Sequence, residues 1–334
     1  MNDDGMSVRE IARLSGVSIA TVSRVYRGVG NVSPQTRAKV QAAIDQYGYR
    51  PSHFGEALAN RRHRALGVVF PGLSGPYFAE LINGVETIAV PAQMSVHVIG
   101  THYRRDVPGE LLDVAGRVDG MAIHGGTVEA DVIQQIAARQ PVVMIGPDAH
   151  PGPVVVRTDH EAYLLLVRHL LVDHGLRKLI FIGNADGSPD VTERWAAFKA
   201  AHEELGLRTA EPLRTGLEQV HGVRAADEVL SGGYDGAVCG NDETALGLMM
   251  AVLGRGRKVP DDLVITGVDD VAMSSLVSPG LTTIARPLAE LGATATRLLL
   301  DMISGEEVPA ETVLRAELVK RASCGCHDRT PPTR

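Results

Sequence analysis

Short apolar runs alternate with amphipathic segments from Leu66 onward, and this alternation constrains the fold more than any other feature of the sequence. Most of the apolar runs are nearly continuous, as strands buried on both faces of a parallel sheet are; they occupy residues 66–70, 96–99, 121–123, 142–145, 154–156, 179–182, 237–239 and 263–266. Between most of them lie segments with helical periodicity, such as residues 77–90, 161–173, 192–205 and 243–253. The alternation predicts βαβ units in doubly wound parallel sheets, and a coarse duplication about Thr158 predicts two such lobes.

The first fifty residues instead predict three short helices. A capping box, S-x-x-E, starts the first helix at Ser7, Ser18 can cap a second over residues 19–27, and a serine–proline pair starts a third at Ser33. Glycines follow each helix as stop signals, at Gly16, Gly28, Gly30 and Gly48. Apolar residues at helical spacing predict a small core made of Val8, Ile11, Leu14, Val22, Val25, Val40, Ala43, Ile44 and Tyr47.

The charge of the chain is unevenly divided. Residues 1–64 hold ten Lys/Arg and five Asp/Glu, a net +5, and the remaining 23 and 35 give −12, so that the sum is −7. A basic head on an acidic body indicates that only the head approaches a polyanion. The sequence has no apolar leader, no run of the roughly 18–20 apolar residues of a membrane span and no disulfide framework. We therefore expect a cytoplasmic protein with no membrane partner.

The second predicted helix carries side chains suited to the edges of DNA bases. In a helix-turn-helix, the N-terminal residues of the second helix enter the major groove, which requires small or flexible side chains there. Ile19 and Ala20 can pack on a thymine methyl group, and Arg24 can bind guanine O6 and N7 together. Hydroxyl groups and free N–H groups nearby suit phosphate oxygens, at Ser18, Thr21 and Ser23. The alternative is a plain three-helix domain without a DNA contact.

The run from Val8 to Pro51 resembles the LacI/GalR (lactose and galactose repressor) family, through A-x-x-x-G-V-S-x-A-T-V-S-R-V at residues 12–25 and G-Y-R-P at residues 48–51. A looser resemblance extends to about Cys324. It implies an all-α helix-turn-helix head over residues 6–50, a hinge over 51–64, an α/β periplasmic-binding-protein-like (type I) two-lobed sensor over 65–325, and a polar tail over 326–334. The first lobe would comprise residues 65–158 and 287–309, and the second 159–284 and 312–325. Further DNA contacts are expected from Ser7, Asn31 and Tyr49.

The resemblance also gives the hinge a role. In such repressors, paired hinge helices press a leucine into the minor groove, and Leu58 stands at that position. The alternative is that Leu58 packs on the partner hinge. Gly55 and Glu56 are less usual here, because glycine lowers helix propensity by about 1 kcal/mol relative to alanine and glutamate faces a polyanion. We expect Leu58→Ala to weaken operator binding and to leave the sensor intact.

Ligands of doubly wound sheets bind at the carboxyl ends of the strands, so residues that follow each predicted strand are candidates. Arg194 matches the arginine that holds effector oxygens in this family, and its planar five-donor group suits vicinal hydroxyls or a carboxylate. Asp269 matches the family's effector-binding aspartate, while Asn241 offers donors and an acceptor and Asp242 is expected to cap the next helix. The expected effector site comprises Leu73, Tyr77, Phe78, His124, Asp159, Asp190, Arg194, Asn241 and Asp269.

One departure from the family pattern bears on the effector. Many relatives have an effector-binding aspartate where this chain has Gly146, and His124 stands where small polar residues are commoner. These differences predict an unusual effector, to which His102 or His124 can contribute; the alternative for each histidine is a structural role without a ligand contact. The alternative for Tyr77 is aromatic core packing at the start of a helix.

The C-terminal residues give information about the oligomeric state and about metal binding. The family's leucine-heptad tail is absent, which favours a homodimer. Two cysteines and an adjacent histidine, in Cys324-Gly325-Cys326-His327, are insufficient for a metal site. We therefore expect neither a metal nor a cofactor.

Two rival classes of function fit the sequence poorly. No dinucleotide fingerprint follows the first predicted strand, and neither a G-x-S-x-G elbow nor a phosphate-binding loop occurs, so we expect no catalytic residues. The basic head and the missing leader oppose a periplasmic solute receptor. The expected function is a transcriptional repressor whose affinity for a near-palindromic double-stranded operator is controlled by a small molecule, a sugar, between the lobes. A corepressor-type regulator responding to a nucleobase or another metabolite remains an alternative.

Overall fold

The computed structural model describes residues 6–26, 28–49, 63–102, 106–147 and 152–326. The chain divides into two compact units, with the boundary after Arg64. The predicted hinge helix with Leu58 lies outside the described residues. Within them, none of the helices combines the length and the apolarity that a membrane span requires.

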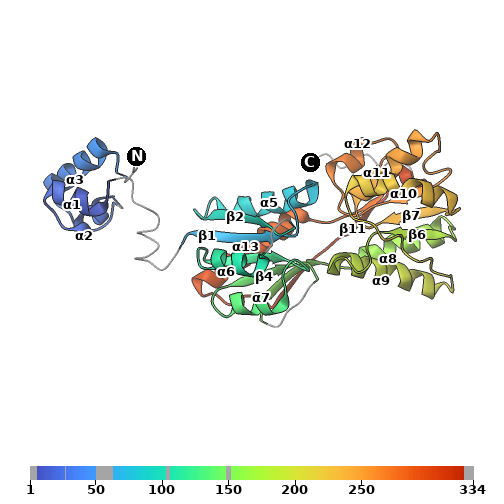
Figure 1. Cartoon of the computed structure of the whole chain (residues 1–334), viewed down its shortest axis with the longest axis horizontal. Helices are drawn as coiled ribbons and strands as arrows, with labels where there is room; N and C mark the ends of the chain where they lie inside the picture. Colours follow the sequence, from blue (N-terminus) through green and yellow to red (C-terminus); the bar gives the residue numbers. More distant parts are fainter. Residues whose placement is uncertain (1–5, 27, 50–62, 103–105, 148–151, 327–334) are drawn as a thin grey trace. The chain divides into compact units, whose positions relative to one another are not determined.

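The first unit contains the helices α1, α2 and α3 (Figure 1), and they begin with the caps that the sequence predicted. Helix α1 (Val8–Ser15) begins with the capping box of Ser7 and ends at a left-handed Gly16. At the start of α2 (Ile19–Tyr26), the Ser18 hydroxyl accepts a hydrogen bond from the Thr21 N–H. Helix α3 (Pro34–Tyr47) is capped by Ser33 and stops at Gly48.

The core of this first unit differs from the prediction at two positions. Leu14 is 39% exposed and Tyr47 is 41% exposed, so neither is a core residue. On α1 the buried face instead passes through Ile11, Ala12 and Ser15, and Leu14 lies beside it. After Gly48 the chain turns back, and the buried Tyr49 ring covers the core.

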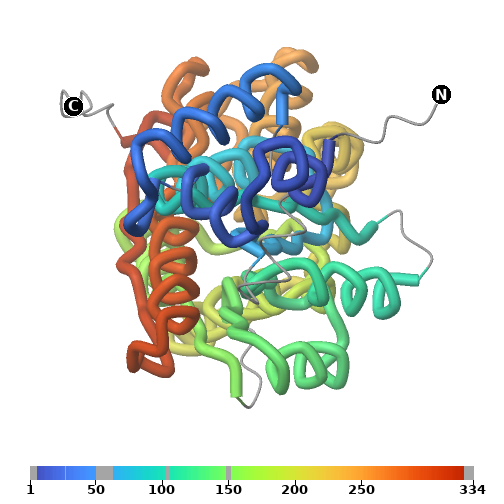
Figure 2. Tube along the Cα trace, turned by 90° about the vertical axis from the view of Figure 1, so that its left-hand side faces the viewer, coloured from blue at the N-terminus to red at the C-terminus, as the bar shows by residue number. Residues whose placement is uncertain are grey.

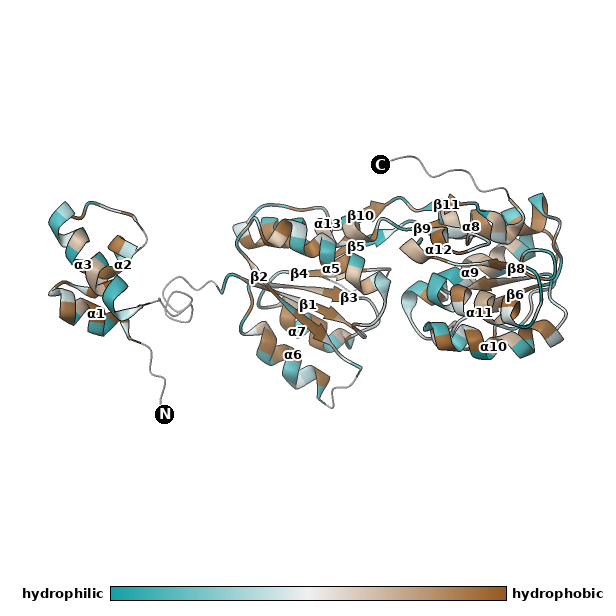
Figure 3. Cartoon of the chain, turned by 90° about the horizontal axis from the view of Figure 1, so that it is seen from above, coloured by the Kyte–Doolittle hydropathy of each residue, from teal (hydrophilic) through white to brown (hydrophobic). Residues whose placement is uncertain are grey.

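The first lobe of the second unit is built on a parallel sheet of six strands within the described residues, in the order β10-β5-β4-β3-β1-β2. The strands are β1 (Ala65–Phe70), β2 (Ser95–Gly100), β3 (Gly120–His124), β4 (Val142–Ile145), β5 (Val154–Thr158) and β10 (Glu311–Leu314). One face packs against α5 (Pro76–Ala89) and α13 (Leu288–Ser304), and the other against α6 (Val107–Ala115) and α7 (Ala130–Ala137). The inner strands are mostly hydrophobic, whereas the helices carry both polar and apolar residues (Figure 3).

The end of the chain returns to the first lobe before it finishes in the second. Helix α13 packs on α5, and β10 joins the edge of the first sheet (Figures 1 and 2). The expectation that the second lobe resumes at residue 312 is therefore wrong, because residues 311–314 pair with β5. The strand β10 has no continuous apolar run, because burial alternates along it and Glu311 and Val313 are exposed. The sequence pattern therefore did not predict this edge strand.

The second lobe contains the parallel strands β6 (Leu179–Ile182), β7 (Gly236–Cys239) and β8 (Val264–Thr266), in that order. The strands β9 (Thr283–Ala285) and β11 (Glu317–Val319) form an antiparallel pair, which the expected parallel sheet did not include. Two hydrophobic clusters flank the three parallel strands. One involves α10 (Gln219–Ser231) and α11 (Asp242–Gly254), and the other α8 (Glu161–Arg168) and α9 (Pro189–Glu204). The eight predicted strands are all present, with ends shifted by at most two residues.

Candidate functional site

In the first lobe, the strand order reverses between β1 and β3, and this is where ligands bind open α/β sheets. Tyr77 and Phe78 begin α5 after β1, and His124 ends β3. The Tyr77 hydroxyl lies 3.0 Å from His124 Nε2, and the Phe78 ring centroid lies 5.2 Å from that of Phe70. We call these four residues the aromatic wall.

In the second lobe, four charged side chains meet at the carboxyl ends of the strands. Asp190 and Arg194 lie one turn apart on α9, Asp269 follows β8, and Arg286 follows β9. Their side chains are 12, 6, 5 and 1% exposed in that order. Charged groups this deeply buried are rare unless they are paired. We call these four residues the charged cluster.

Arg286 connects the charged cluster to the first lobe. Its Nη2 donates to Asp190 Oδ1 at 3.1 Å, and its Nη1 to Asp269 Oδ1 at 3.3 Å. Its Nε donates to the Thr158 hydroxyl at 3.2 Å, and the guanidinium lies 5.5 Å from the centroid of the Tyr77 ring. Arg286 was not among the predicted site residues, although its place just after the last predicted crossover was a usable signal.

Arg194 has unused hydrogen-bonding capacity. It donates to the Gly240 carbonyl, and its Nη2 lies 3.6 Å from Asp190 Oδ1. Its guanidinium carbon lies 5.6 Å from the centroid of the Tyr163 ring. Among the described residues, neither Arg194 Nε nor the buried Tyr163 hydroxyl has a hydrogen-bond partner. Buried polar groups without partners are uncommon, so these two retain hydrogen-bonding capacity that the fold does not use.

The electrostatics leave the site close to neutral. Burial opposes ionisation of Asp190, yet the guanidinium groups of Arg286 and Arg194 lower its pKa to about 2. Burial lowers the pKa of His124 and keeps its ring uncharged. Two guanidinium groups face two carboxyl groups, so an uncharged ligand rich in hydroxyls suits this site better than a strongly charged one.

Close approaches of the two lobes occur at glycines of the first lobe. A Cβ atom at Gly126 would lie 2.7 Å from Pro189 Cδ, and one at Gly146 would lie 3.5 Å from Asp190 Oδ2. The departure at Gly146 therefore has a physical reason. An aspartate there would face the Asp190 carboxylate of the second lobe.

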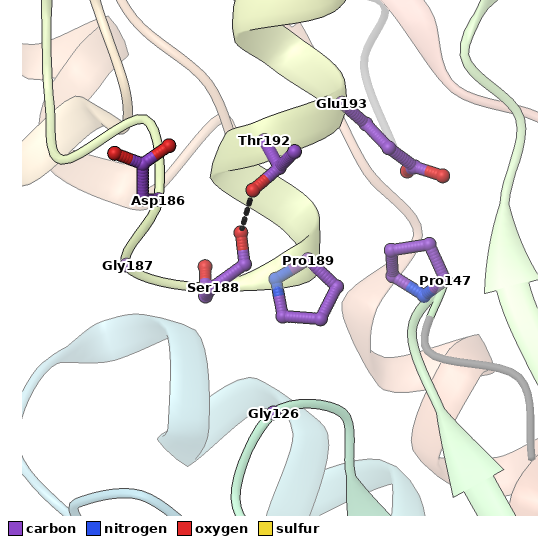
Figure 4. A pocket seen from close by; sticks show the side chains of 8 residues that line it. All are labelled: Gly126, Pro147, Asp186, Gly187, Ser188, Pro189, Thr192 and Glu193. Atoms are coloured by element: carbon purple, nitrogen blue, oxygen red, sulfur yellow. Dashed lines mark hydrogen bonds between the residues drawn. The ribbon is translucent and has the colours of Figure 1, made fainter.

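A cleft of about 540 Å³ opens between the lobes beside the charged cluster (Figure 4). It is lined by Gly126, Pro147, Asp186, Gly187, Ser188, Pro189, Thr192 and Glu193. The Thr192 hydroxyl donates to the Ser188 carbonyl at 2.9 Å and fixes the start of α9 (Figure 4). The cleft has room for a small ligand beside the first turn of α9, where Asp190 lies.

Three predicted effector residues lie apart from this cluster. Leu73 is 52% exposed, and Asp159 Oδ2 accepts a hydrogen bond from the Ala316 N–H at 3.4 Å. The Asn241 side chain already has hydrogen-bond partners within the protein. Its Nδ2 donates to the Leu217 carbonyl at 2.9 Å, and its Oδ1 accepts from the Thr244 N–H at 3.0 Å.

The expected cap of α11 was wrong by one residue. Asn241 is the cap, and Asp242 is fully buried behind it. The Asp242 carboxylate accepts hydrogen bonds from the Val271 N–H and from the hydroxyls of Ser274 and Thr283. Burial raises the pKa of Asp242 to about 7. Asp242 thus ties the segment after β8 and the strand β9 to the start of α11.

In the first unit, α2 presents most of the predicted DNA contacts to solvent. The side chains of Ser18, Ile19, Ala20 and Arg24 are exposed, as is Asn31, and Thr21 and Ser23 are half-buried. Ser7 uses its hydroxyl in the capping box, at 2.8 Å from Glu10 Oε2. Tyr49 was expected at DNA, and its ring is buried in the core of this unit, 6.4 Å from the Tyr26 ring centroid.

A basic three-helix unit that exposes side chains of its second helix, followed by a two-lobed α/β unit with a buried charged cluster and a cleft beside it, defines a class of protein: a ligand-responsive transcriptional regulator. Family models agree with this class. The model for the lacI family of bacterial regulatory proteins matches residues 7–52, and that for a periplasmic binding protein-like domain matches residues 167–324.

Catabolite control protein A of Priestia megaterium is 30% identical to this chain over 321 residues, covering 92% of the chain and 96% of that protein. The chain belongs to the LacI family of bacterial regulatory proteins. Its relatives are transcriptional regulators, and this excludes the two rival classes, the enzyme and the periplasmic receptor.

Two solved structures illustrate the similarity. The lac repressor dimer bound to operator and an anti-inducer shares the fold, with a TM-score of 0.84 at 24% identity over 96% of this chain and 99% of that one. A LacI family regulator from Enterococcus faecium with bound ribose has a TM-score of 0.71 at 28% identity, over 78% of this chain and 98% of that one.

Proposed function

We propose that this LacI-family regulator is a homodimeric repressor that binds a near-palindromic operator and responds to a sugar held between its two lobes. The observation that carries the proposal is the buried charged cluster, which lies where strands of the second lobe end and touches the aromatic wall of the first. As a regulator of transcription it would act in the cytoplasm, with residues 6–50 as the DNA-binding domain and residues 51–64 as the hinge.

The head would read DNA through α2. A side chain that is apolar and 47% exposed, as Ile19 is, suits a thymine methyl group in the major groove. Arg24, one turn further along the same helix, would bind a guanine edge. The hydroxyls of Ser18, Thr21 and Ser23 and the amide of Asn31 would position the head on phosphates. Insertion of Leu58 into the minor groove remains part of this proposal.

The sensor would recognise hydroxyl groups. Guanidinium donors from Arg194 and Arg286 and carboxylate acceptors from Asp190 and Asp269 provide both kinds of hydrogen bond that a sugar needs. The aromatic wall would pack against its apolar face. The Enterococcus faecium regulator with bound ribose supports a sugar as the ligand class.

Effector binding would change how the lobes are held together. A ligand that takes hydrogen bonds from Arg286 competes with its contact to Thr158, which joins the lobes in this structure, and with its contact to Asp190 within the second lobe. The equilibrium between open and closed lobes then shifts by the difference in the ligand's affinity for the two states. The hinge would pass this shift to the paired heads.

A ligand screen tests the sensor part of the proposal. We expect a pentose, hexose or disaccharide to raise the melting temperature of the full chain, since a ligand that binds only the folded state stabilises it. Titration calorimetry on Asp269→Asn should show affinity reduced roughly 10- to 150-fold, because hydrogen bonds to a charged group contribute about 1.5–3 kcal/mol. The control Asp227→Asn changes an exposed carboxylate and should bind normally. Equal affinity in both variants would contradict the site.

A nucleobase-responsive corepressor is the second candidate. It is favoured by the aromatic wall, where the Tyr77 and Phe78 rings pack edge to face with centroids 5.0 Å apart and offer an aromatic surface to a planar ring. The same screen distinguishes the candidates. If a nucleobase binds the chain and strengthens its affinity for the operator, the corepressor proposal would replace the proposal of a sugar-responsive repressor.

A further inference from the structure

Four metal-ligating side chains converge in the second lobe, at its C-terminal end. They are His169, His174, Cys324 and Cys326, and their ligand atoms all lie within 4.8 Å of one another. The two histidine Nε2 atoms are 3.0 Å apart. Cys326 Sγ lies 3.5 Å from each of them, and Cys324 Sγ lies 3.6 Å from His169 Nε2.

These separations fit one tetrahedral ion. Zinc binds histidine nitrogen at about 2.0–2.1 Å and cysteine sulfur at about 2.3 Å. In a tetrahedron these bond lengths place two nitrogens about 3.3 Å apart, and a nitrogen and a sulfur about 3.6 Å apart. The three nitrogen–sulfur separations of 3.5–3.6 Å match this geometry, and the nitrogen pair is slightly closer.

Local backbone geometry brings each pair of ligands together. Residues His169–Asp173 form a π-helical turn, and the His174 N–H donates to the His169 carbonyl at 3.2 Å. Because a π-helix repeats its hydrogen bonds every five residues, it aligns residues 169 and 174 on one side. Such turns are frequent at functional sites.

The cysteine pair depends on the glycine between its members. Gly325 has φ +95°, a left-handed conformation that follows the short helix Ala322–Cys324. A Cβ atom there would lie 3.6 Å from the His174 ring, so this turn packs closely on the histidines. The turn directs both thiols toward the same place.

The surroundings support metal binding. His169 Nδ1 lies 2.6 Å from Asp173 Oδ2, and metal-binding histidines usually make such a bond through their other ring nitrogen.

We propose that His169, His174, Cys324 and Cys326 bind one Zn²⁺ ion that fastens the C-terminal segment of the chain to the end of the α8 helix. Four protein ligands leave no open coordination position, so the site is structural and not catalytic. No metal was expected from the sequence, because only ligands adjacent in the chain were counted. The two histidines come from about 150 residues earlier.

Metal analysis of the full chain tests the proposal. Protein purified under reducing conditions should contain one zinc per chain by elemental mass spectrometry. After removal by a chelator, addition of Co²⁺ alone should produce the visible bands of tetrahedral cobalt and a thiolate charge-transfer band, and Zn²⁺ should abolish both. Cys326→Ser and His174→Gln should each lose most of the bound metal, whereas Cys239→Ala, which removes the remaining cysteine, should keep it.

Thiol protection in the unaltered chain keeps the test independent of how the variants fold. Alkylation of Cys326, which is partly exposed, should slow at least tenfold when Zn²⁺ is added to the metal-free protein. Three results would each overturn the proposal: no stoichiometric Zn²⁺ or Co²⁺ in reduced protein, full metal content in folded Cys326→Ser, or a Cys324–Cys326 disulfide as the form isolated under reducing conditions.

Discussion

The head and the sensor arrange their proposed recognition residues in opposite ways. In the head they occupy a short stretch of sequence, mostly on α2, and most are exposed. In the sensor they range from Tyr77 to Arg286, and the charged cluster is buried. A surface that meets DNA has to stay open, whereas a site that encloses a small molecule has to pair its charges when they leave water. The following substitutions test this contrast.

Arg286→Met should have the largest effect. It leaves Asp190 and Asp269 with one fewer buried counter-charge, and breaking such a pair costs about 3–5 kcal/mol of the unfolding free energy. The only tryptophan of the chain, Trp195, lies on α9 and reports unfolding of the sensor by fluorescence in urea. Arg168→Met removes an exposed pair with Glu204 and should cost only about 0–1 kcal/mol. If both variants lost the same unfolding free energy, the buried ion pairs of Arg286 would be no more important for stability than an exposed pair.

Arg24→Ala should act on the head alone. Loss of a bidentate contact with guanine costs about 1–3 kcal/mol of operator binding, roughly 5- to 150-fold in affinity. Fluorescence anisotropy with a selected operator measures this change. Arg255→Ala, an exposed arginine of the sensor, should bind the operator normally. If Arg24→Ala also shifted the urea midpoint of Trp195 fluorescence, the head and the sensor would not be independent.

The stability of the sensor should fall in mild acid because of His124. Burial lowers the pKa of this ring below the ordinary 6.5, so the unfolded chain takes up the proton first. The contribution to stability is therefore fully present above about pH 6.5 and is lost as the pH falls toward the folded-state pKa. At about pH 5.5 the loss reaches at most about 1.4 kcal/mol. Melting temperatures from about pH 8 to 5.5 should decline more in the unaltered chain than in His124→Gln; parallel profiles would exclude this role.

The smallest effect is expected from a helix cap in the head. The Ser33 hydroxyl accepts a hydrogen bond from the Thr36 N–H at 3.2 Å, and Ser33→Ala should destabilise the head by about 1 kcal/mol. Ser33→Gly should cost only a few tenths of a kcal/mol, because glycine is itself an acceptable cap. Circular dichroism of the helical signal during heating can compare the two variants. Alanine as stable as serine would show that this cap is dispensable.

The contrast between the head and the sensor also explains which helices and strands could be predicted from the sequence. Caps and glycine stops are local, so the three helices of the head were predicted almost to the residue. Buried strands are visible as apolar runs, and all eight predicted strands are present. The polar edge strand β10 and the antiparallel pair of β9 and β11 were missed because short strands with mixed polarity lack that signal.

Sites assembled from distant segments were predicted only in part. Tyr77, His124, Asp190, Arg194 and Asp269 do come together, but Arg286 was missed. No sequence spacing places His169 beside Cys326, because a π-helical turn and a return of the C-terminal chain create that contact. The cap of α11 was assigned to Asp242 and not to Asn241, since both residue types cap helices equally well.

The most direct test of the account is the coupling between effector and operator. Operator affinity of the full chain should be measured by fluorescence anisotropy with and without the sugar that the screen identifies, in the unaltered chain and in Arg194→Ala. We predict a change of roughly 5- to 150-fold in the unaltered chain, which corresponds to a coupling of about 1–3 kcal/mol. Arg194→Ala should bind the operator equally well and show no response. A fully responsive Arg194→Ala would contradict the proposed effector site.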